Sequence, residues 1–517
     1  MTTENHWPEK IAKSLIQKHP KQTITCASGI SPSGHIHIGN LREIMTTEFV
    51  VKALSDKGTI VDFLFSWDDF DRFRKIPYGF PETMKEDIGK PYSAIKDPFG
   101  EFDSYASRFI NEFETSLEKL NIRPRFIRQS QRYSSGEYTE DIKICLEKRI
   151  EIANILARNM TQGMTEEQIF NFFPIQIYSR FSGKDNTQVL NWDGSSKVEY
   201  LCRDTNKKDT VDLDKDFCIK LPWKIDWPMR WKKEGVLFEP GGPDHASPGS
   251  SYDVSSQISR EIFGFEPPSF QEYGFIRIKG ENGKMSSSKG NIIIPEELLR
   301  VYSPAMIKWI YGKTIPNSQL DVALDKDVIK NYAEFDEFLR NDSSSFFYQL
   351  IEQEARQKNS IPFRQIFGLG EATNYDISKI EQILSQENSN FDSDSVKDRL
   401  EKSDYWSQTY YPEGRSTQLA NFNQDYYTNL PEDRRIQIKR LTDVISRNNL
   451  SIDELETEIY AIPKREGMTD KEKKVAQRTF FKDTYNLLFG KDQGPRLPTY
   501  FWANEENKQI KNLLSTE

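Results

Sequence analysis

The residues of this chain best suited to phosphate chemistry lie in a turn at 31–40, which carries two of the five histidines. A β-branched stretch at 23–27 predicts a strand before the turn, and apolar spacing after Asn40 predicts a helix. Free N–H groups at such a helix start favour phosphate. The alternative is a solvated turn. We expect ATP-binding residues here, namely Pro32, Gly34, His37, Gly39 and Asn40, with His35 and His37 as catalytic residues.

A second cluster is a basic, hydroxyl-rich loop flanked by glycines at 280–290. A lysine ammonium is a compact charge that can follow a moving phosphate, and a mobile loop can neutralise departing pyrophosphate at the transition state. The alternative is a solvated surface loop. We expect Lys284 and Lys289 to be catalytic, and the ATP contacts to include Lys284, Met285, Ser286, Ser287 and Ser288.

A third motif, Gly-Pro-Asp at 242–244, stands between the other two. Taken alone it is a common turn. At a strand end, however, Asp244 can accept hydrogen bonds from ribose hydroxyls, and we assign Gly242 and Asp244 to ATP. The three motifs in this order predict a class I nucleotidyl-transfer site that opens ATP at its α-phosphate.

Strands and helices alternate over 21–131, with strands at 60–65 and 125–128 and a helix at 102–120. This predicts an α/β fold with a doubly wound, Rossmann-like parallel sheet, in which ligands gather at the carboxyl ends of strands. The pattern breaks over roughly 133–235, where we expect an insertion with a long helix at 138–159. The sheet resumes near Gly235, and helices dominate after Pro295.

The chain resembles the class I aminoacyl-tRNA synthetases, with 32–40 and 284–288 matching their two ATP signatures. More narrowly, it is similar to the class I lysyl-tRNA synthetases. The segment 226–231 (Asp-Trp-Pro-Met-Arg-Trp) is the most specific to that group. The match is dense in the catalytic half and sparse in the last third, and its other segments are 27–34, 67–75, 242–252, 284–290 and 494–497.

The resemblance implies attachment of lysine to tRNA(Lys) in two steps, with ATP and Mg²⁺. Lysine attacks the α-phosphorus, pyrophosphate leaves, and the adenylate is transferred to the 2′-hydroxyl of the terminal adenosine. It also implies a catalytic domain at 1–300, a connecting region at 301–345 and a helical anticodon-binding domain at 346–517. Basic clusters at 434–440, 464–465 and 471–478 are candidates for tRNA contact, as are the aromatic residues Tyr405, Trp406, Tyr410 and Tyr411; the alternative for most of them is core or solvated surface.

A lysine pocket needs apolar or aromatic walls and an acid or a π-face near the ammonium. By resemblance, the amino-acid site is lined by Gly29, Ser31, Trp227, His245 and Tyr273. From the residues themselves, Asp68, Asp69 and Asp71 are candidate acids, and we place Trp227 and Trp231 in a proline-containing loop. We include Asp68 in the pocket, although the sequence leaves open which acid reads the ε-amine. The alternative for these aspartates is a solvated turn or salt bridges to nearby cations, namely Arg72, Arg74 or Lys75.

Composition limits the setting in which the chain works. The net charge is −9, so a tRNA must meet local basic patches. No apolar run approaches the roughly 20 residues needed to span a bilayer, and the first ten residues lack the apolar core of a signal peptide. Four scattered cysteines indicate a reduced compartment. We expect a cytoplasmic monomer with no membrane partner.

Many class I lysyl enzymes bind structural zinc through cysteine pairs in the insertion and a Cys-His beside an Asp-Pro-x-Gly turn. Here the turn at 97–100 is followed by Glu101 and Phe102, and the later part of the insertion keeps only Cys202 and Cys218. Tetrahedral zinc normally needs four ligands. We therefore expect no structural zinc, and a loop or short hairpin between these two cysteines.

Three alternatives remain open at this point. A glutamyl-type enzyme would need arginines for the substrate's side-chain carboxylate, which the aspartate-rich strand end disfavours. A non-catalytic tRNA-binding paralogue usually shows decay of the ATP motifs, which are intact here. A small-molecule adenylyltransferase would not need the long helical tail.

Overall fold

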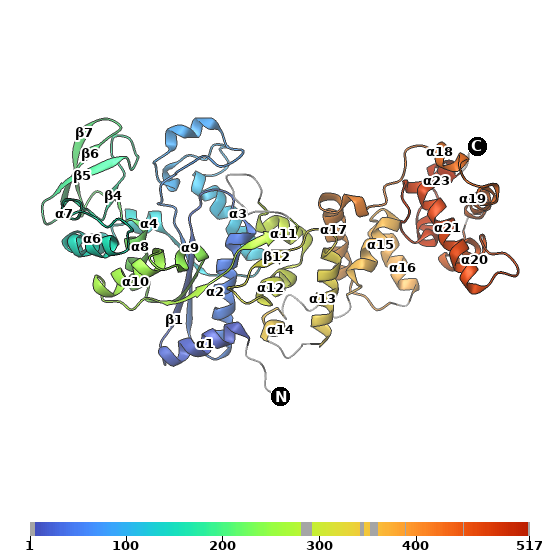
Figure 1. Cartoon of the computed structure of the whole chain (residues 1–517), viewed down its shortest axis with the longest axis horizontal. Coiled ribbons are helices and arrows are strands. Elements are labelled where there is room, and N and C mark those ends of the chain that lie inside the picture. The colour runs from blue at the N-terminus through green and yellow to red at the C-terminus, as the bar shows by residue number, and fades with distance from the viewer. Residues whose placement is uncertain are drawn as a thin grey trace. The chain divides into compact units, whose positions relative to one another are not determined.

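The computed structural model describes residues 6–280, 292–341, 346–351, 360–387, 389–447 and 449–514. Its central strands are β1 (Ile24–Ile30), β2 (Val61–Trp67), β3 (Arg125–Arg128), β9 (Val236–Gly241) and β10 (Ser269–Glu272). They form one parallel sheet in the order β10-β9-β1-β2-β3, of which Figure 1 labels β1. The order reverses beside β1, where doubly wound sheets bind ligands. The predicted Rossmann-like sheet is confirmed.

The sheet is accompanied by α1 (Trp7–Lys18), α2 (Ile38–Asp56) and α3 (Tyr105–Lys119), with short 3₁₀ turns η1 (Glu82–Asp87) and η2 (Tyr92–Ala94). Helix α2 follows β1 and packs against it and β2. Its buried side includes Leu41, Ile44 and Phe49, the apolar spacing that predicted the helix. This packing fixes the start of α2 at the carboxyl end of β1.

The insertion between β3 and β9 contains α4 (Gln129–Ser134), α5 (Thr139–Glu147), α6 (Arg149–Arg158), α7 (Glu166–Phe170) and α8 (Trp223–Glu234), and strands β4 (Gln176–Ile177), β5 (Thr187–Trp192), β6 (Lys197–Cys202), β7 (Lys207–Asp212) and β8 (Ile219–Lys220). The single long helix expected at 138–159 is wrong. Two helices, α5 and α6, occupy this range instead. They meet at Lys148, whose ammonium donates to the Ile262 carbonyl at 3.0 Å. Strands β6 and β7 form a hairpin that begins before Cys202, so only its second strand lies in the segment between Cys202 and Cys218 where a loop or short hairpin was expected. Strand β5 extends it into a three-stranded antiparallel sheet.

The segment 226–231 lies in helix α8, so the loop predicted there is wrong. Pro228 has no N–H, which leaves the Lys224 carbonyl without its helical donor. The Ser255 hydroxyl donates to that carbonyl instead, at 3.0 Å. A tertiary partner therefore allows proline inside the helix, and Gly235 ends the helix in the left-handed conformation (φ 64°).

After β9 follow α9 (Pro243–Ala246), α10 (Ser251–Glu261), β11 (Ile276–Ile278), α11 (Pro295–Val301), α12 (Pro304–Gly312), β12 (Leu320–Val322), α13 (Val328–Asn341) and α14 (Phe346–Ile351). The chain divides into two compact units. The region 301–345, which was expected to connect the two domains, is divided between the two units. Helix α12 and strand β12 belong to the first unit, and α13 belongs to the second. Helix α14 returns to the first unit, where Phe347 packs edge-on to Phe49 of α2.

The second unit is helical, as predicted. Besides α13 it contains α15 (Phe363–Thr373), α16 (Ile377–Gln386), α17 (Ser393–Thr409), η3 (Pro412–Gly414), α18 (Gln424–Thr428), α19 (Glu432–Ile445), α20 (Ile452–Ala461), α21 (Asp470–Phe489), α22 (Leu497–Ala503) and α23 (Lys508–Leu514). One apolar cluster includes Ile380 and Leu400, and a larger one includes Leu441 and Leu487. Among the described helices of the chain, none is both long and apolar enough to cross a bilayer.

Candidate active site

The predicted nucleotide turn leads from β1 into α2 through a capping box. His37 precedes the helix, and its Nδ1 accepts from the Gly39 N–H at 3.1 Å. The Asn40 Oδ1 accepts from the His37 N–H at 3.3 Å. Because Nδ1 accepts, the ring proton lies on Nε2, a donor suited to a phosphate oxygen. The turn therefore presents a neutral donor and a helix N-terminus together.

His35 lies apart from this arrangement. Its Nδ1 is 2.8 Å from the Glu112 carboxylate on α3, and its ring packs edge-on to Phe109 at 5.1 Å. Among the described residues, those lining the cleft below His37 do not include His35, Pro32 or Gly34. Sequence proximity to His37 thus does not bring His35 into the same cavity, because α3 holds its ring.

A cleft of about 660 Å³ lies at the carboxyl ends of the sheet strands. It brings together residues predicted from all over the first 280 positions: Gly29, Ser31, His37, Gly39, Asn40, Asp68, Gly242, Asp244, His245 and Tyr273. A methyl group on Gly242 would stand 3.6 Å from the Tyr273 hydroxyl, so the backbone here passes close to that ring. The cleft is large enough for a nucleotide and an amino acid side by side.

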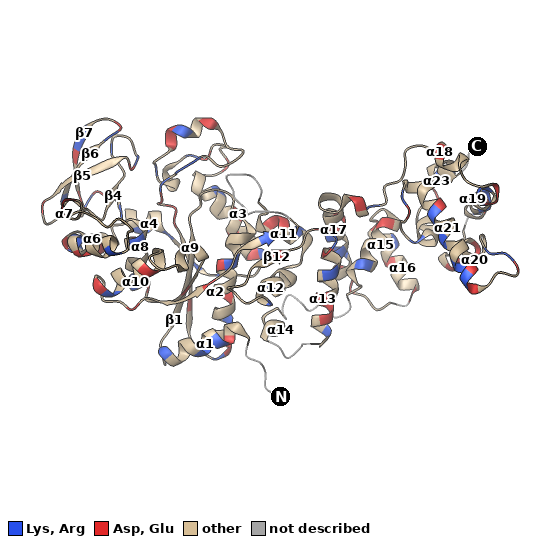
Figure 2. Ribbon diagram, in the orientation of Figure 1, with Lys and Arg blue, Asp and Glu red and all other residues tan. Residues whose placement is uncertain are grey.

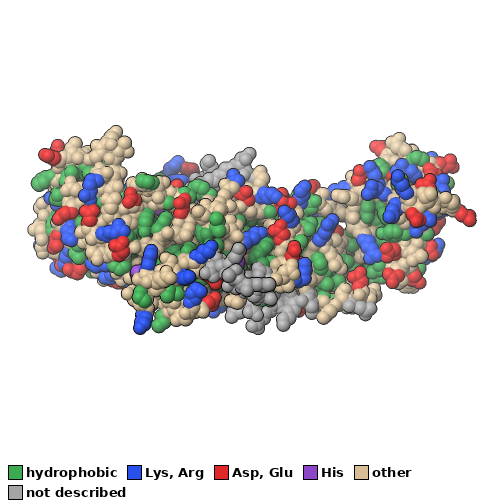
Figure 3. Space-filling model, turned by 60° about the horizontal axis from the view of Figure 1, so that its bottom comes forward, with side chains coloured by type: hydrophobic (Ala, Val, Ile, Leu, Met, Phe, Trp, Pro, Cys, Tyr) green, Lys and Arg blue, Asp and Glu red, His purple; other side chains and the backbone are tan. Residues whose placement is uncertain are grey.

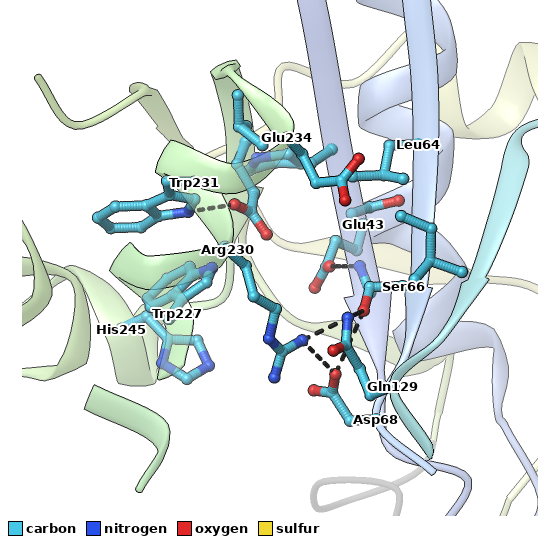
Figure 4. Close-up of a pocket in the computed structure, with 18 of the residues that line it drawn as sticks. Glu43, Leu64, Ser66, Asp68, Gln129, Trp227, Arg230, Trp231, Glu234 and His245 are labelled. Carbon is cyan, nitrogen blue, oxygen red and sulfur yellow. Dashed lines mark hydrogen bonds and ion pairs between the residues drawn. The ribbon is translucent and has the colours of Figure 1, made fainter. Parts of the chain in front are cut away.

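A smaller cavity of about 70 Å³ opens beside the cleft and shares Gly29, Glu43, Asp68, Trp223 and His245 with it (Figure 4). Its wall on α8 is a row of three indoles: the ring centroids of Trp223 and Trp227, and of Trp227 and Trp231, are each 4.8 Å apart.

His245 packs against the indole of Trp227, with ring centroids 5.5 Å apart. Burial lowers the pKa of His245, and its buried Nδ1 has no hydrogen-bond partner among the described residues. The neutral imidazole is thus available to a ligand.

The three aspartates that follow β2 all have protein partners. The Asp68 carboxylate lies 2.5 Å from the Arg230 guanidinium, and the Asp71 carboxylate lies 2.5 Å from the Lys220 ammonium. The third, Asp69, accepts from the Ser130 N–H at 2.7 Å. The salt-bridge alternative therefore holds for Asp68 and Asp71, although their partners come from the insertion rather than from the neighbouring cations.

Glu43 is a buried acid of a different kind. Its carboxylate accepts from the Gly29 N–H at 2.9 Å and from the Tyr273 hydroxyl at 2.7 Å. Burial raises the pKa of Glu43 to about 8, and no cation pairs with it among the described residues. Deeper in the cavity, the Glu239 carboxylate accepts from the Trp231 indole at 2.6 Å, and burial raises the pKa of Glu239 to about 7. An incoming cation would favour the ionised form of both acids.

Comparison with known proteins decides the family. The family model described as "tRNA synthetases class I (K)" matches residues 5–366. This chain belongs to the class I tRNA synthetases. A lysine–tRNA ligase of Pyrococcus horikoshii is 32% identical to this synthetase over 98% of its chain and 99% of that protein. A lysine–tRNA ligase of Treponema pallidum is 34% identical over 95% of each.

The sequence motifs of this synthetase do not single out Glu43 or Glu239. A signal existed for both, since each is a carboxylate within an apolar stretch: Glu43 beside Leu41 and Ile44, and Glu239 after Phe238. A charge at a core position calls for a partner or a function. Only the neighbours in the folded chain, such as Tyr273, show whether the charge has a partner or a function.

Two further predictions for this synthetase stay predictions. The loop at 284–289, with Lys284, Met285, Ser286, Ser287, Ser288 and Lys289, lies outside the described residues. As for zinc, Cys202 is buried at the end of β6 and Cys218 is partly buried. The described part of the chain contains no group of three or more His, Cys, Asp or Glu able to hold a metal ion.

Proposed function

We propose that this chain is a lysine–tRNA ligase, which forms lysyl-adenylate from lysine and ATP and then transfers the lysyl group to tRNA(Lys). The observation that carries the proposal is Glu43, a buried carboxyl without a cation partner among the described residues, where the cleft meets the indole-walled cavity. The relatives that match almost the whole chain carry the same name.

The first step needs position and charge rather than a general base, because the carboxylate of lysine is already ionised. A carboxylate oxygen bonds to the α-phosphorus as the bond to the bridging oxygen of pyrophosphate breaks. His37 Nε2 and the start of α2 hold the phosphates, Gly242 and Asp244 hold the ribose, and Lys284 and Lys289 stabilise the departing pyrophosphate. Mg²⁺ would reach the site together with ATP and would neutralise part of the charge on its phosphates.

Side-chain selection follows from the cavity. The four-carbon stem of lysine packs along Trp223 and Trp227, and its ammonium pairs with Glu43, which Tyr273 holds in place. Glutamate would need an unpaired cation. The one cation in the described cavity lining is Arg230, which already pairs with Asp68 and Asp226. The lining therefore favours lysine over glutamate.

The second unit is proposed to hold the anticodon. Helix α21 places Lys474 and Arg478 beside Phe481 and Tyr485 around a shallow groove, a combination of cations and rings that suits single-stranded RNA. Lys and Arg are interspersed with Asp and Glu along the other helices of this unit and on its surface (Figures 2 and 3). Trp406 serves the core instead, since it is fully buried and its Nε1 donates to the Leu324 carbonyl at 2.8 Å.

The test is ATP–pyrophosphate exchange with each of the twenty amino acids, with and without tRNA(Lys). We expect exchange with lysine alone. Glu43→Gln should raise the KM for lysine at least tenfold, because a neutral amide cannot pair with the ammonium, while the KM for ATP changes little. The matched control is Glu118→Gln on the exposed side of α3. Exchange with glutamate, or an unchanged KM in Glu43→Gln, would refute the proposal.

A further inference from the structure

A second polar pocket, of about 250 Å³, lies within the helical second unit. Its walls come from the end of α15, the extended segment 415–418 and the end of α22. Amides and a hydroxyl dominate the lining, from Asn374, Thr417, Gln418 and Asn504. Most of the lining can therefore both donate and accept hydrogen bonds without carrying charge.

The two charged side chains of the pocket are engaged with the protein. The Arg415 guanidinium pairs with the Asp404 carboxylate at 2.7 Å and lies over the Tyr375 ring at 4.7 Å. The Glu371 carboxylate accepts from the Tyr375 hydroxyl at 2.9 Å. A phosphate or a carboxylate would find no unpaired cation in the described lining, so the pocket selects a neutral polar ligand.

One amide nitrogen of the pocket lacks a hydrogen-bond partner among the described residues. The Gln418 Oε1 accepts two long hydrogen bonds, from the Tyr500 hydroxyl and the Asn507 amide, each at 3.4 Å. The buried Gln418 Nε2 has no partner among the described residues. Flipping the amide would place Oε1 at the position of Nε2, and the oxygen would then lack a partner there. A buried amide atom without a partner favours a ligand that supplies the missing hydrogen bond.

The backbone at the rim of the pocket is strained. Asn374 and Tyr375 are consecutive non-glycine residues in the left-handed region, at φ 55° and 58°. Such conformations persist where the surrounding structure holds them, often at binding sites. Here Asn374 ends α15 as its C-cap, and both residues line the pocket.

We propose that this pocket binds one unstacked base of the tRNA anticodon loop. Single-stranded RNA is read through the hydrogen-bonding edges of splayed bases, by amides and hydroxyls beside aromatic rings. The pocket offers those groups in a neutral lining of suitable size. The proposal rests on the proposed lysine–tRNA ligase function and adds which side chains read a base.

The test measures dissociation constants of the full chain for tRNA(Lys) and for transcripts with each anticodon-loop base replaced in turn. The variants are Gln418→Ala and Asn374→Gly; the second removes an amide while glycine accepts the left-handed backbone, so folding is preserved. The control is Gln382→Ala, exposed on α16. We expect both variants to bind tRNA(Lys) about three- to tenfold more weakly and to lose discrimination at one loop position only.

Unchanged discrimination in both variants, or a loss spread evenly over all loop positions, would overturn the pocket assignment while the ligase proposal stands. Absence of tRNA(Lys) binding by the unaltered chain would overturn both. The two failures are therefore distinguishable.

Discussion

In the proposed lysine site, Glu43 couples substrate selection to its own protonation. Burial holds its pKa at about 8 in the folded protein, against about 4.5 for an ordinary glutamate. Between these values the folded chain keeps a proton that the unfolded chain releases. The free energy of unfolding therefore falls as the pH rises through this range, because only the unfolded chain gains free energy from ionising the carboxyl. An ammonium beside the carboxylate offsets this cost, so lysine binding and proton release are coupled.

This coupling predicts the pH dependence of lysine binding. From about pH 6 to pH 8 the affinity should rise, approaching tenfold per pH unit for one proton released, and it should level off above the pKa of about 8. Calorimetric titration in buffers of different ionisation enthalpy measures the proton count directly. In Glu43→Gln the slope should flatten. A slope that persists in this variant would assign the proton to another group, with Glu239 as the first to test.

Lys220 links the insertion to the sheet. The Lys220 ammonium, at the end of β8, lies 2.5 Å from the Asp71 carboxylate and 3.2 Å from that of Asp226 on α8. Asp71 in turn accepts from the Ser31 hydroxyl at 2.9 Å, at the entrance of the cleft. Burial opposes the charge, but the Asp226 and Asp71 carboxylates raise the pKa of Lys220 to about 12, so it stays charged.

Removing this cation should destabilise the first unit. Lys220→Met leaves Asp71 without its cation, while Asp226 keeps Arg230, and we expect a loss of roughly 3–5 kcal/mol in the free energy of unfolding. Urea denaturation at neutral pH measures it. Lys220→Arg, which keeps the charge, should lose clearly less. Equal losses in the two variants would mean that packing rather than charge decides the effect.

Local patterns predicted the elements better than the site. The strand at 125–128 and the helix of α3 were predicted closely, because β-branched and amphipathic spacings are local signals. Helix α8 was missed because Ser255, far along the chain, replaces the hydrogen bond lost at Pro228. The partners of Asp68 and Asp71 were missed for the same reason. Only folding brings Arg230 and Lys220 to them.

Over the whole molecule, acidic composition and tRNA binding are reconciled by local charge. The net charge is −9, yet the groove on α21 contains Lys474 and Arg478. The one acid in its described lining, Asp492, pairs with Lys482. Phosphate contacts of this kind release counterions and weaken in salt. The proposed lysine site lies in the partly enclosed cavity beside the cleft, where salt screens much less.

The two substrates should therefore respond differently to salt. Between roughly 50 and 200 mM salt, the KM for tRNA(Lys) should rise steeply while the KM for lysine stays nearly constant. Lys474→Ala and Arg478→Ala should each reduce the slope of log KM against log salt by about one. Lys57→Ala, at the exposed end of α2, is the control. A slope unaffected by the α21 variants would place the tRNA contacts elsewhere.

The row of indoles on α8 has an optical consequence. Trp223, Trp227 and Trp231 lie with neighbouring centroids 4.8 Å apart, close enough for their electronic transitions to couple. Such coupling gives a circular dichroism signal in the ultraviolet that depends on the angles between the rings, here 19° and 51°. A side chain that slides along these rings alters their environment and their emission. Occupancy of the pocket can thus be followed in the unlabelled protein by its own light absorption and fluorescence.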